Sequence, residues 1–298
     1  MRCGPAGEST HTSIPIESWL EGVRRHVMQT APDLDHVLAD YLGEARFGAS
    51  LIEGDIESLM RGSRILEIGA GMLLLSCALQ AGGYRVVALD PIGPGFSHMA
   101  RLRQIVLEYA AGQACVPDVR TIPAEQLDSE AEFDFAFSIN VMEHVHDVAA
   151  VLQRVWSALR PGASYRFVCP NYRFPYEPHF DIPTLFSKTL TARVFRSRIL
   201  GSRTVLDPAG TWASLNWISV ALVRRICRRE LGVSPEFDRL VCYLFVRRAI
   251  NDPSFQRRHA PLIRYAFTSL DAVGVTAAFK LLPVGAQPAM SCRLARPR

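Results

Sequence analysis

The sequence contains only two lysines, Lys188 and Lys280, so arginine supplies nearly all of its positive charge. Its seven cysteines are scattered singly and none forms a CxxC pair, which argues against a zinc site or a disulfide framework and predicts reduced thiols. No apolar run reaches the roughly 18 residues that a membrane-spanning helix needs. The first residues also lack the apolar core of a signal peptide. These absences predict a cytoplasmic protein without a transmembrane segment.

The composition is that of a chain with a sizeable core. Of the 298 residues, 49% are hydrophobic and 21% are charged, which excludes a disordered or collagen-like protein. Residues 1–171 hold 13 basic and 21 acidic residues, whereas residues 172–298 hold 20 and 8. The basic second half favours an anionic or lipid-linked small-molecule acceptor, although solvated, arginine-rich helix faces give the same pattern. Its arginine pairs lack interleaved aromatic residues, which argues against nucleic acid. The oligomeric state is left open.

The hydrophobic periodicity changes along the chain. Residues 16–60 have the apolar spacing of helices and predict an N-terminal helical cap over residues 1–60. Strands are then predicted at 64–68, 85–89, 116–121, 133–138 and 165–169, alternating with helices at 72–81, 97–110 and 148–159. This alternation predicts a parallel sheet with helices on both faces.

The regular pattern ends after Pro170. Residues 171–213 are rich in proline, arginine and aromatic residues without a clear period, and a helix is predicted at 215–230. We interpret residues 171–233 as a lid or acceptor-binding insertion within one domain that spans residues 61–298. Helices near 240–250 and 254–272 and strands near 234–241 and 287–294 complete it.

A glycine loop follows the first predicted strand. Gly69-Ala70-Gly71 would let the chain turn tightly and let a ligand approach the backbone. Glu67 lies two residues before the loop and would point into the same crevice. Asp90 ends the next strand, where its carboxylate can accept both ribose hydroxyls of an adenosyl group. Together they predict a nucleoside-binding site.

The ordered segments LEIGAG, VVALD, FDFAFSINVMEHVHD, LRPGA and YRFVCPNY resemble a class I S-adenosylmethionine (SAM)-dependent methyltransferase. The resemblance covers about residues 60–172. Within this class, the segments are similar to the small-molecule group that includes the ubiquinone-type O-methyltransferases. It implies a doubly wound, mostly parallel, seven-stranded Rossmann-like sheet, and methyl transfer from SAM to a small metabolite at oxygen. The cofactor-binding residues that it implies are Glu67, Gly69, Ala70, Gly71, Asp90, Ala124, Glu125 and Asn140.

The chain departs from the family pattern at three places. Leu73 stands where the family often has a third glycine, and Pro123 stands where an aspartate often precedes the Ala-Glu pair. No Asn-Pro-Pro-Tyr follows the fourth strand, which argues against the amide- and adenine-amine-methylating branches. Leu74 in place of a glycine argues against a dinucleotide site. An N- or C-methyltransferase, an RNA methyltransferase and a non-catalytic SAM-binding subunit remain alternatives.

Two histidines are the candidate catalytic residues, His144 as a base and His179 as the polar group nearest the acceptor. His144 follows the fourth strand and could be oriented by Glu143, and His179 lies in the proline-framed segment after the fifth strand. The alternatives are that Glu143 and His144 cap the next helix, and that the proline-rich segment packs its aromatic residues on the core. The predicted walls of the acceptor site are Tyr172, Tyr176 and Trp212. Five further histidines stand apart without a carboxylate or a second histidine at metal-binding spacing, so no metal is expected: His11, His26, His36, His98 and His259.

Overall fold

The computed structural model describes residues 16–91, 99–185, 187–205, 207–258 and 261–298. The first 15 residues of the predicted cap lie outside these ranges. So do the beginning of the helix expected at 97–110 and two residues within the one expected at 254–272. Within the described ranges, no helix combines the length and the apolar character needed to cross a bilayer.

A seven-stranded sheet forms the centre of the molecule, with the strand order β3-β2-β1-β4-β5-β7-β6. Strands β1 to β5 are parallel to one another where they pair, and β7 runs antiparallel between β5 and β6. This confirms the predicted doubly wound, mostly parallel sheet. The strands are β1 (Arg64–Ile68), β2 (Arg85–Leu89), β3 (Asp118–Arg120), β4 (Phe133–Ile139), β5 (Leu159–Pro170), β6 (Glu236–Phe237) and β7 (Ala289–Ala295).

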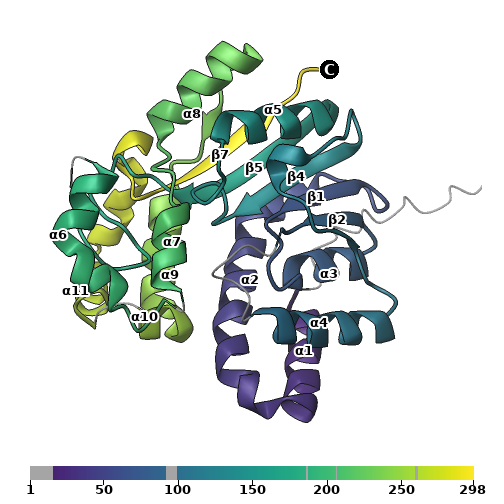
Figure 1. Ribbon diagram of the computed structural model, residues 1–298, viewed down its shortest axis with the longest axis horizontal. Helices are drawn as coiled ribbons and strands as arrows, with labels where there is room; N and C mark the ends of the chain where they lie inside the picture. The colour runs from purple at the N-terminus through teal and green to yellow at the C-terminus, as the bar shows by residue number, and fades with distance from the viewer. Residues whose placement is uncertain (1–15, 92–98, 186, 206, 259–260) are drawn as a thin grey trace, which may run out of the picture.

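Helices cover both faces of the sheet (Figure 1). One face carries α1 (Ile16–Thr30), α2 (Asp35–Glu57), α3 (Leu74–Ala81) and α4 (Met99–Gly112). The other carries α5 (Val148–Ala158) and α8 (Val220–Ile226). The remaining helices gather beyond the β7 side: α6 (Lys188–Leu200), α7 (Pro208–Ser214), α9 (Val241–Asn251), α10 (Pro253–Arg258) and α11 (Pro261–Ala272).

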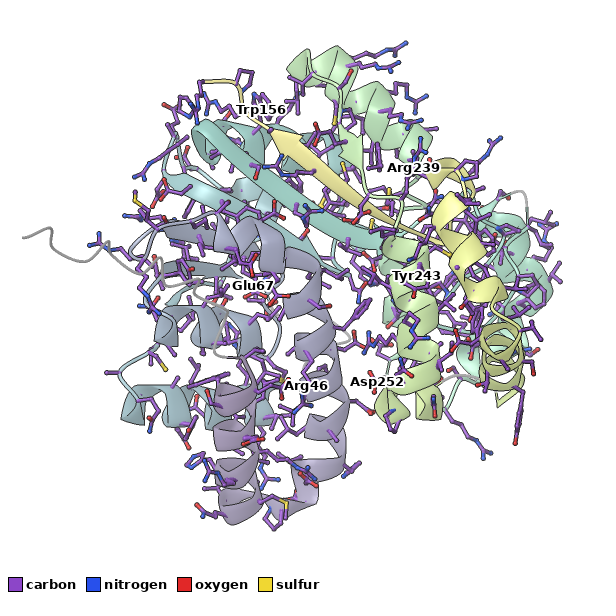
Figure 2. All side chains as sticks on the ribbon, turned by 180° about the vertical axis from the view of Figure 1, so that it is seen from behind. Arg46, Glu67, Trp156, Arg239, Tyr243 and Asp252 are labelled. Carbon is purple, nitrogen blue, oxygen red and sulfur yellow. The ribbon has the colours of Figure 1, made fainter. Side chains whose placement is uncertain are left out.

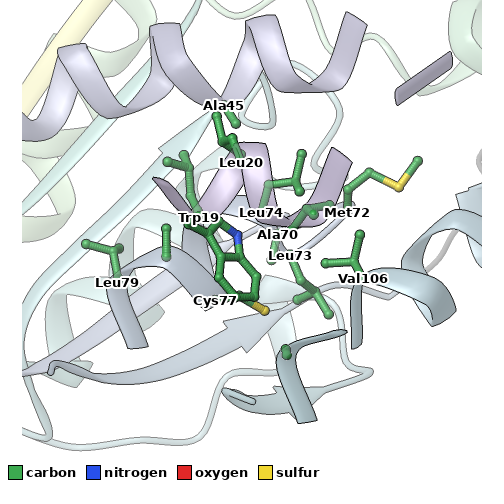
Figure 3. Packing of buried hydrophobic residues seen from close by; sticks show 14 of the residues in the cluster. Trp19, Leu20, Ala45, Ala70, Met72, Leu73, Leu74, Cys77, Leu79 and Val106 are labelled. Atoms are coloured by element: carbon green, nitrogen blue, oxygen red, sulfur yellow. The ribbon is translucent and has the colours of Figure 1, made fainter. Parts of the chain in front are cut away.

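The N-terminal helices belong to the main hydrophobic core. Trp19 and Leu20 on α1 are buried among residues of α3 such as Leu74 and Cys77 (Figure 3). On the opposite face, α5 buries the stripe that its sequence predicts, including Val151 and Leu152. Because both faces are covered, the central strands are apolar on both sides.

The segment predicted to be irregular contains two helices. Asp207 caps α7 by accepting a hydrogen bond from the backbone of Gly210, and Pro208 occupies the first turn, which is an N-terminal signal readable in the sequence. By contrast, α6 buries only Thr191 and Ile199 among its residues, so no apolar stripe marks it. Helix α8 falls within the range 171–233 predicted as a lid, yet it packs on the sheet beside α5.

Ion pairs fix α2 against the C-terminal part of the chain. Arg248 of α9 donates to both carboxylate oxygens of Glu44 at 3.0 and 2.9 Å and to Asp252 at 3.0 Å. Its guanidinium also lies over the rings of Phe47 and Phe255. This arrangement holds in place the α2 turn that contributes to the site described next.

Candidate active site

A cavity of about 550 Å³ opens at the carboxyl ends of β1, β2 and β4. Its size is in the range of small-molecule sites. Figure 2 shows one of its lining residues, Glu67, in the interior of the molecule. Every residue to which the resemblance assigned the cofactor lines this cavity: Glu67, Gly69, Ala70, Gly71, Asp90, Ala124, Glu125 and Asn140. Their individual roles remain predictions, although the structure brings them together.

The glycine loop has backbone angles that favour glycine. Gly69 has φ +72° and donates from its N–H to the carbonyl of Leu89 at 2.7 Å. A Cβ placed on Gly69 would lie 2.3 Å from a methyl carbon of Val141, so the loop has no room for a side chain there. Leu73, at the position of the family's third glycine, adopts φ +61° and is fully buried. The loop therefore keeps its shape without that glycine.

The two acids of the cavity have different environments. Glu67 is almost fully buried and accepts a hydrogen bond from Ser76. Burial raises the pKa of Glu67 to about 8; the Ser76 hydroxyl opposes this increase and the charge of Asp90 adds to it. Asp90 instead accepts a hydrogen bond from Arg103 of α4, whose side chain is 8% exposed. Arg103 was not predicted as a site residue, because a single arginine on an amphipathic helix does not indicate its partner.

The raised pKa of Glu67 predicts a pH-dependent stability. Between about pH 4.5 and 8 the folded protein keeps this carboxyl protonated while the unfolded chain ionises it. The free energy of unfolding therefore falls with rising pH by up to about 1.4 kcal/mol per pH unit. In Glu67→Gln this contribution is absent. The stability of the variant relative to the wild type should therefore increase as the pH rises. Urea unfolding of both proteins without cofactor at pH 5.5 and 7.5 measures the difference. An equal change in the free energy of unfolding of the two proteins between these pH values would contradict the raised pKa of Glu67.

The segment between β3 and β4 supplies another wall of the cavity. Ala124 is buried there, and the carboxylate of Glu125 accepts hydrogen bonds from the backbone N–H groups of His146 at 2.8 Å and Asp147 at 3.2 Å. Glu125 thus shapes the turn after β4 as well as lining the cavity. Asn140, at the end of β4, has φ +55°. This bend directs the chain after β4 along the cavity rim.

Several lining residues come from segments without a motif. Tyr41, Glu44 and Ala45 of α2 form one side, so the helical cap closes the cavity from the N-terminal part of the chain. Ser214, at the end of α7, contributes from the predicted lid. The only sequence feature that could have indicated the lining residues of α2 is the pattern of small and polar residues on this helix. That pattern does not distinguish a cavity wall from a solvated face.

His144 is the predicted catalytic residue that lines the cavity. Its Nδ1 lies 2.7 Å from Oγ of Ser214, and the Ser214 hydroxyl donates to the carbonyl of Thr211 at 2.8 Å. Since that hydroxyl has a single hydrogen, Nδ1 of His144 must be the donor, which leaves the lone pair on Nε2. Burial, together with the charges of His179 and Lys188, lowers the pKa of His144 to about 3. His144 is therefore a neutral imidazole with a fixed tautomer.

His179 and Glu143 lie behind His144, outside the cavity lining. The rings of His144 and His179 are 5.2 Å apart between centroids, and Nδ1 of His179 donates to Glu177 at 2.6 Å. Burial lowers the pKa of His179, but its hydrogen bond to Glu177 and the charges of Glu177 and Glu143 outweigh burial, so the net shift is upward. Glu143 is fully buried, and burial raises its pKa to about 7. The capping role considered for Glu143 and His144 is filled by Asp147, which caps α5.

The predicted acceptor-site aromatic residues are not among those that line the cavity. Tyr172 stacks on Trp217 with centroids 4.6 Å apart, and Trp212 contacts the edge of the same ring. The hydroxyl of Tyr176 donates to Asp181. These side chains form the interior of the segment after β5, and an acceptor-binding role for them remains a prediction.

Comparison with known proteins agrees with this architecture. A family model for the methyltransferase domain matches residues 35–204. An uncharacterized protein of Mycobacterium tuberculosis (strain ATCC 25618 / H37Rv) is 41% identical over 281 residues, which cover 94% of this chain and 95% of that protein. A ubiquinone biosynthesis O-methyltransferase of Paramagnetospirillum magneticum is 39% identical over 116 residues, or 38% of this chain and 43% of that enzyme.

Among solved structures, phosphoethanolamine N-methyltransferase 2 of Haemonchus contortus in complex with S-adenosyl-L-methionine aligns with a TM-score of 0.49 and 14% identity. The alignment covers 93% of this chain and 60% of that one. The family match spans more than half of the chain and includes the glycine loop, Asp90 and the segment after β4. The chain belongs to the methyltransferase domain family and is a SAM-dependent enzyme of that family.

Proposed function

We propose that this enzyme transfers the methyl group of SAM to a hydroxyl oxygen of a small metabolite. The observation that carries the proposal is the position of His144, a neutral imidazole in the wall of the cavity that the glycine loop and Asp90 form. The partial similarity to a ubiquinone biosynthesis O-methyltransferase supports the same choice of acceptor atom.

The residues of the chain have distinct tasks in this proposal. Glu67, the glycine loop and Asp90 bind the cofactor, which supplies a methyl group on a positively charged sulfur. His144 presents Nε2 to the acceptor hydroxyl, orients its oxygen and accepts the proton that this oxygen loses on methylation. The pair of His179 and Glu177 supports His144 from behind. Alignment of the nucleophile within about 3–3.5 Å of the methyl carbon and exclusion of water provide most of the rate.

The charge of the acceptor is a separate question. Among the described residues that line the cavity, Arg103 is the only lysine or arginine, and it pairs with Asp90. The anionic or lipid-linked acceptor predicted from the basic second half therefore remains a prediction, to be compared with neutral acceptors. The cytoplasmic location also remains a prediction. Its support is that the six described cysteines are unpaired thiols, which a reducing compartment preserves.

Transfer of an isotope-labelled methyl group tests the proposal. We expect protein incubated with SAM carrying a ¹³C-methyl group and with fractionated metabolites to yield a product whose label has the carbon chemical shift of a methoxy group. Separate fractions of neutral, carboxylated and lipid-linked compounds identify the acceptor class. A label on nitrogen or carbon would contradict the proposal. SAM binding without any labelled product would favour the non-catalytic subunit.

A further inference from the structure

A cluster of one buried and two half-buried side chains, at the junction of the β4 turn and the segment after β5, is arranged like a metal site. One ligand atom each from Glu143, His144 and His179 lies within 4.8 Å of the others. From this geometry we propose that these three residues bind a divalent transition-metal ion beside the cofactor cavity. The inference does not depend on the proposed acceptor atom.

Glu143 supplies the first independent observation. Its side chain is fully buried, and neither carboxylate oxygen has a hydrogen-bond partner among the described residues. A buried carboxyl group without partners is costly. Its Oε1 lies 3.9 Å from Nε2 of His144. A cation bound between these atoms would satisfy the carboxylate.

The hydrogen bonds behind the two imidazoles are a second, independent observation that supports a metal site. His144 donates from Nδ1 to Ser214, and His179 donates from Nδ1 to the carboxylate of Glu177. His144 therefore carries a lone pair on Nε2, and His179 offers one on its Nε2 when its ring is neutral. Metal-binding histidines almost always donate their other ring N–H to such an acceptor, which fixes the tautomer and raises the basicity of the ligand atom.

Glu177 is itself held by several donors. It accepts hydrogen bonds from the hydroxyl of Tyr172 at 3.3 Å and from the backbone N–H groups of His179 at 3.2 Å and Phe180 at 2.9 Å. On the other side of the cluster, Asn216 donates to the carbonyls of Met142 and Val145 and anchors the turn that carries Glu143 and His144. The cluster is thus built on a rigid second layer.

The donor set indicates the class of ion. Two imidazole nitrogens and one carboxylate are typical of catalytic zinc and non-haem iron(II) sites, which keep open positions. Ligand bonds of about 2.0–2.2 Å would draw the three ligand atoms to roughly 3–3.5 Å from one another. Because His144 also lines the cavity, an acceptor hydroxyl would then face the ion instead of the imidazole.

No metal was expected from the sequence, because five of its histidines stand apart without a carboxylate or a second histidine at ligand spacing. Here the second imidazole is 35 positions beyond the first. The fold brings the two together by returning the segment after β5 over the turn after β4.

Metal titration of the untagged protein, stripped with a chelator and free of SAM and acceptor, tests the site. We expect one cobalt(II) ion per chain, with the absorption bands of nitrogen and oxygen ligation, and competition by zinc. Changing a residue that only supports a metal ligand typically weakens metal binding by roughly 10–100-fold, and we expect a loss in this range for Glu177→Gln. Glu143→Gln and His179→Ala each remove a ligand and should weaken binding by more than that. The control His36→Ala, at an exposed residue of α2, should bind like the wild type.

Thermal unfolding of each variant in chelator shows whether it is folded, and zinc should raise the melting temperature of the wild type but not of Glu143→Gln. No binding by the wild type, unchanged affinity in both ligand variants, or bands of thiolate ligation would overturn the site. Metal binding without O-methylation would contradict only the proposed function. O-methylation by a protein that binds no metal would contradict only the metal site.

Discussion

Gly69→Ala is expected to lower SAM affinity by about 30-fold or more while the rest of the protein stays folded. The new Cβ would meet the two methyl carbons of Val141 at 2.3 and 2.7 Å, and φ +72° is unfavourable for any residue with a side chain. Left-handed strain and overpacking together cost roughly 2–5 kcal/mol, and about 1.4 kcal/mol corresponds to tenfold in affinity. We expect the glycine loop to relieve this strain by leaving the conformation that binds SAM, while the rest of the protein stays folded. Calorimetric titration with SAM measures the effect.

A second substitution separates the two causes. Val141→Ala removes both methyl carbons and leaves the Cβ of residue 141 at 3.1 Å, so Gly69→Ala combined with Val141→Ala should recover the part of the affinity lost to the clash. The remaining loss reports the backbone strain. Gly54→Ala on α2, where a Cβ would meet nothing within 4 Å, is the matched control and should bind SAM normally. Equal affinity of wild type and Gly69→Ala would place the cofactor elsewhere.

The cofactor half of the site is predictable because its information is local in the sequence. A short apolar strand, a glycine loop and a helix follow one another within residues 64–81. Asp90 directly follows β2, which pairs with β1. Parallel strands that end at one sheet edge bring such residues together whatever the rest of the chain does. The prediction therefore needed only the order of the strands.

The remaining contacts of the site join residues that are not adjacent in the sequence. The partners Asp90 and Arg103 are joined by the packing of α4, and His144 meets His179 only because the segment after β5 folds back. Helix α6 has no apolar stripe from which it could be predicted. Tyr172 was predicted to form a wall of the acceptor site, but it stacks on Trp217, which adopts φ +60°. Residue type alone does not reveal such a bend in the chain.

Asp90→Ala is expected to destabilise the cofactor-free protein by about 3–5 kcal/mol. The substitution leaves the guanidinium of Arg103, whose side chain is 8% exposed, without its carboxylate partner. Breaking a buried ion pair from one side costs about that much, because the remaining charge is not solvated. The same substitution also removes the group predicted to accept the ribose hydroxyls. Urea unfolding measures the first effect, and calorimetry with SAM measures the second.

The double variant Asp90→Ala/Arg103→Met distinguishes the two roles of Asp90. Replacing an ion pair by apolar groups of similar size is often nearly neutral, so the double variant should regain most of the lost stability. Its SAM affinity should stay low, since a hydrogen bond to a charged group contributes about 1.5–3 kcal/mol and no carboxylate remains at that position. Recovery of both properties would remove Asp90 from the cofactor site and leave it a structural partner of Arg103. Recovery of stability alone identifies the carboxylate as the group that binds the ribose, because the fold is then intact while the ligand contact is missing.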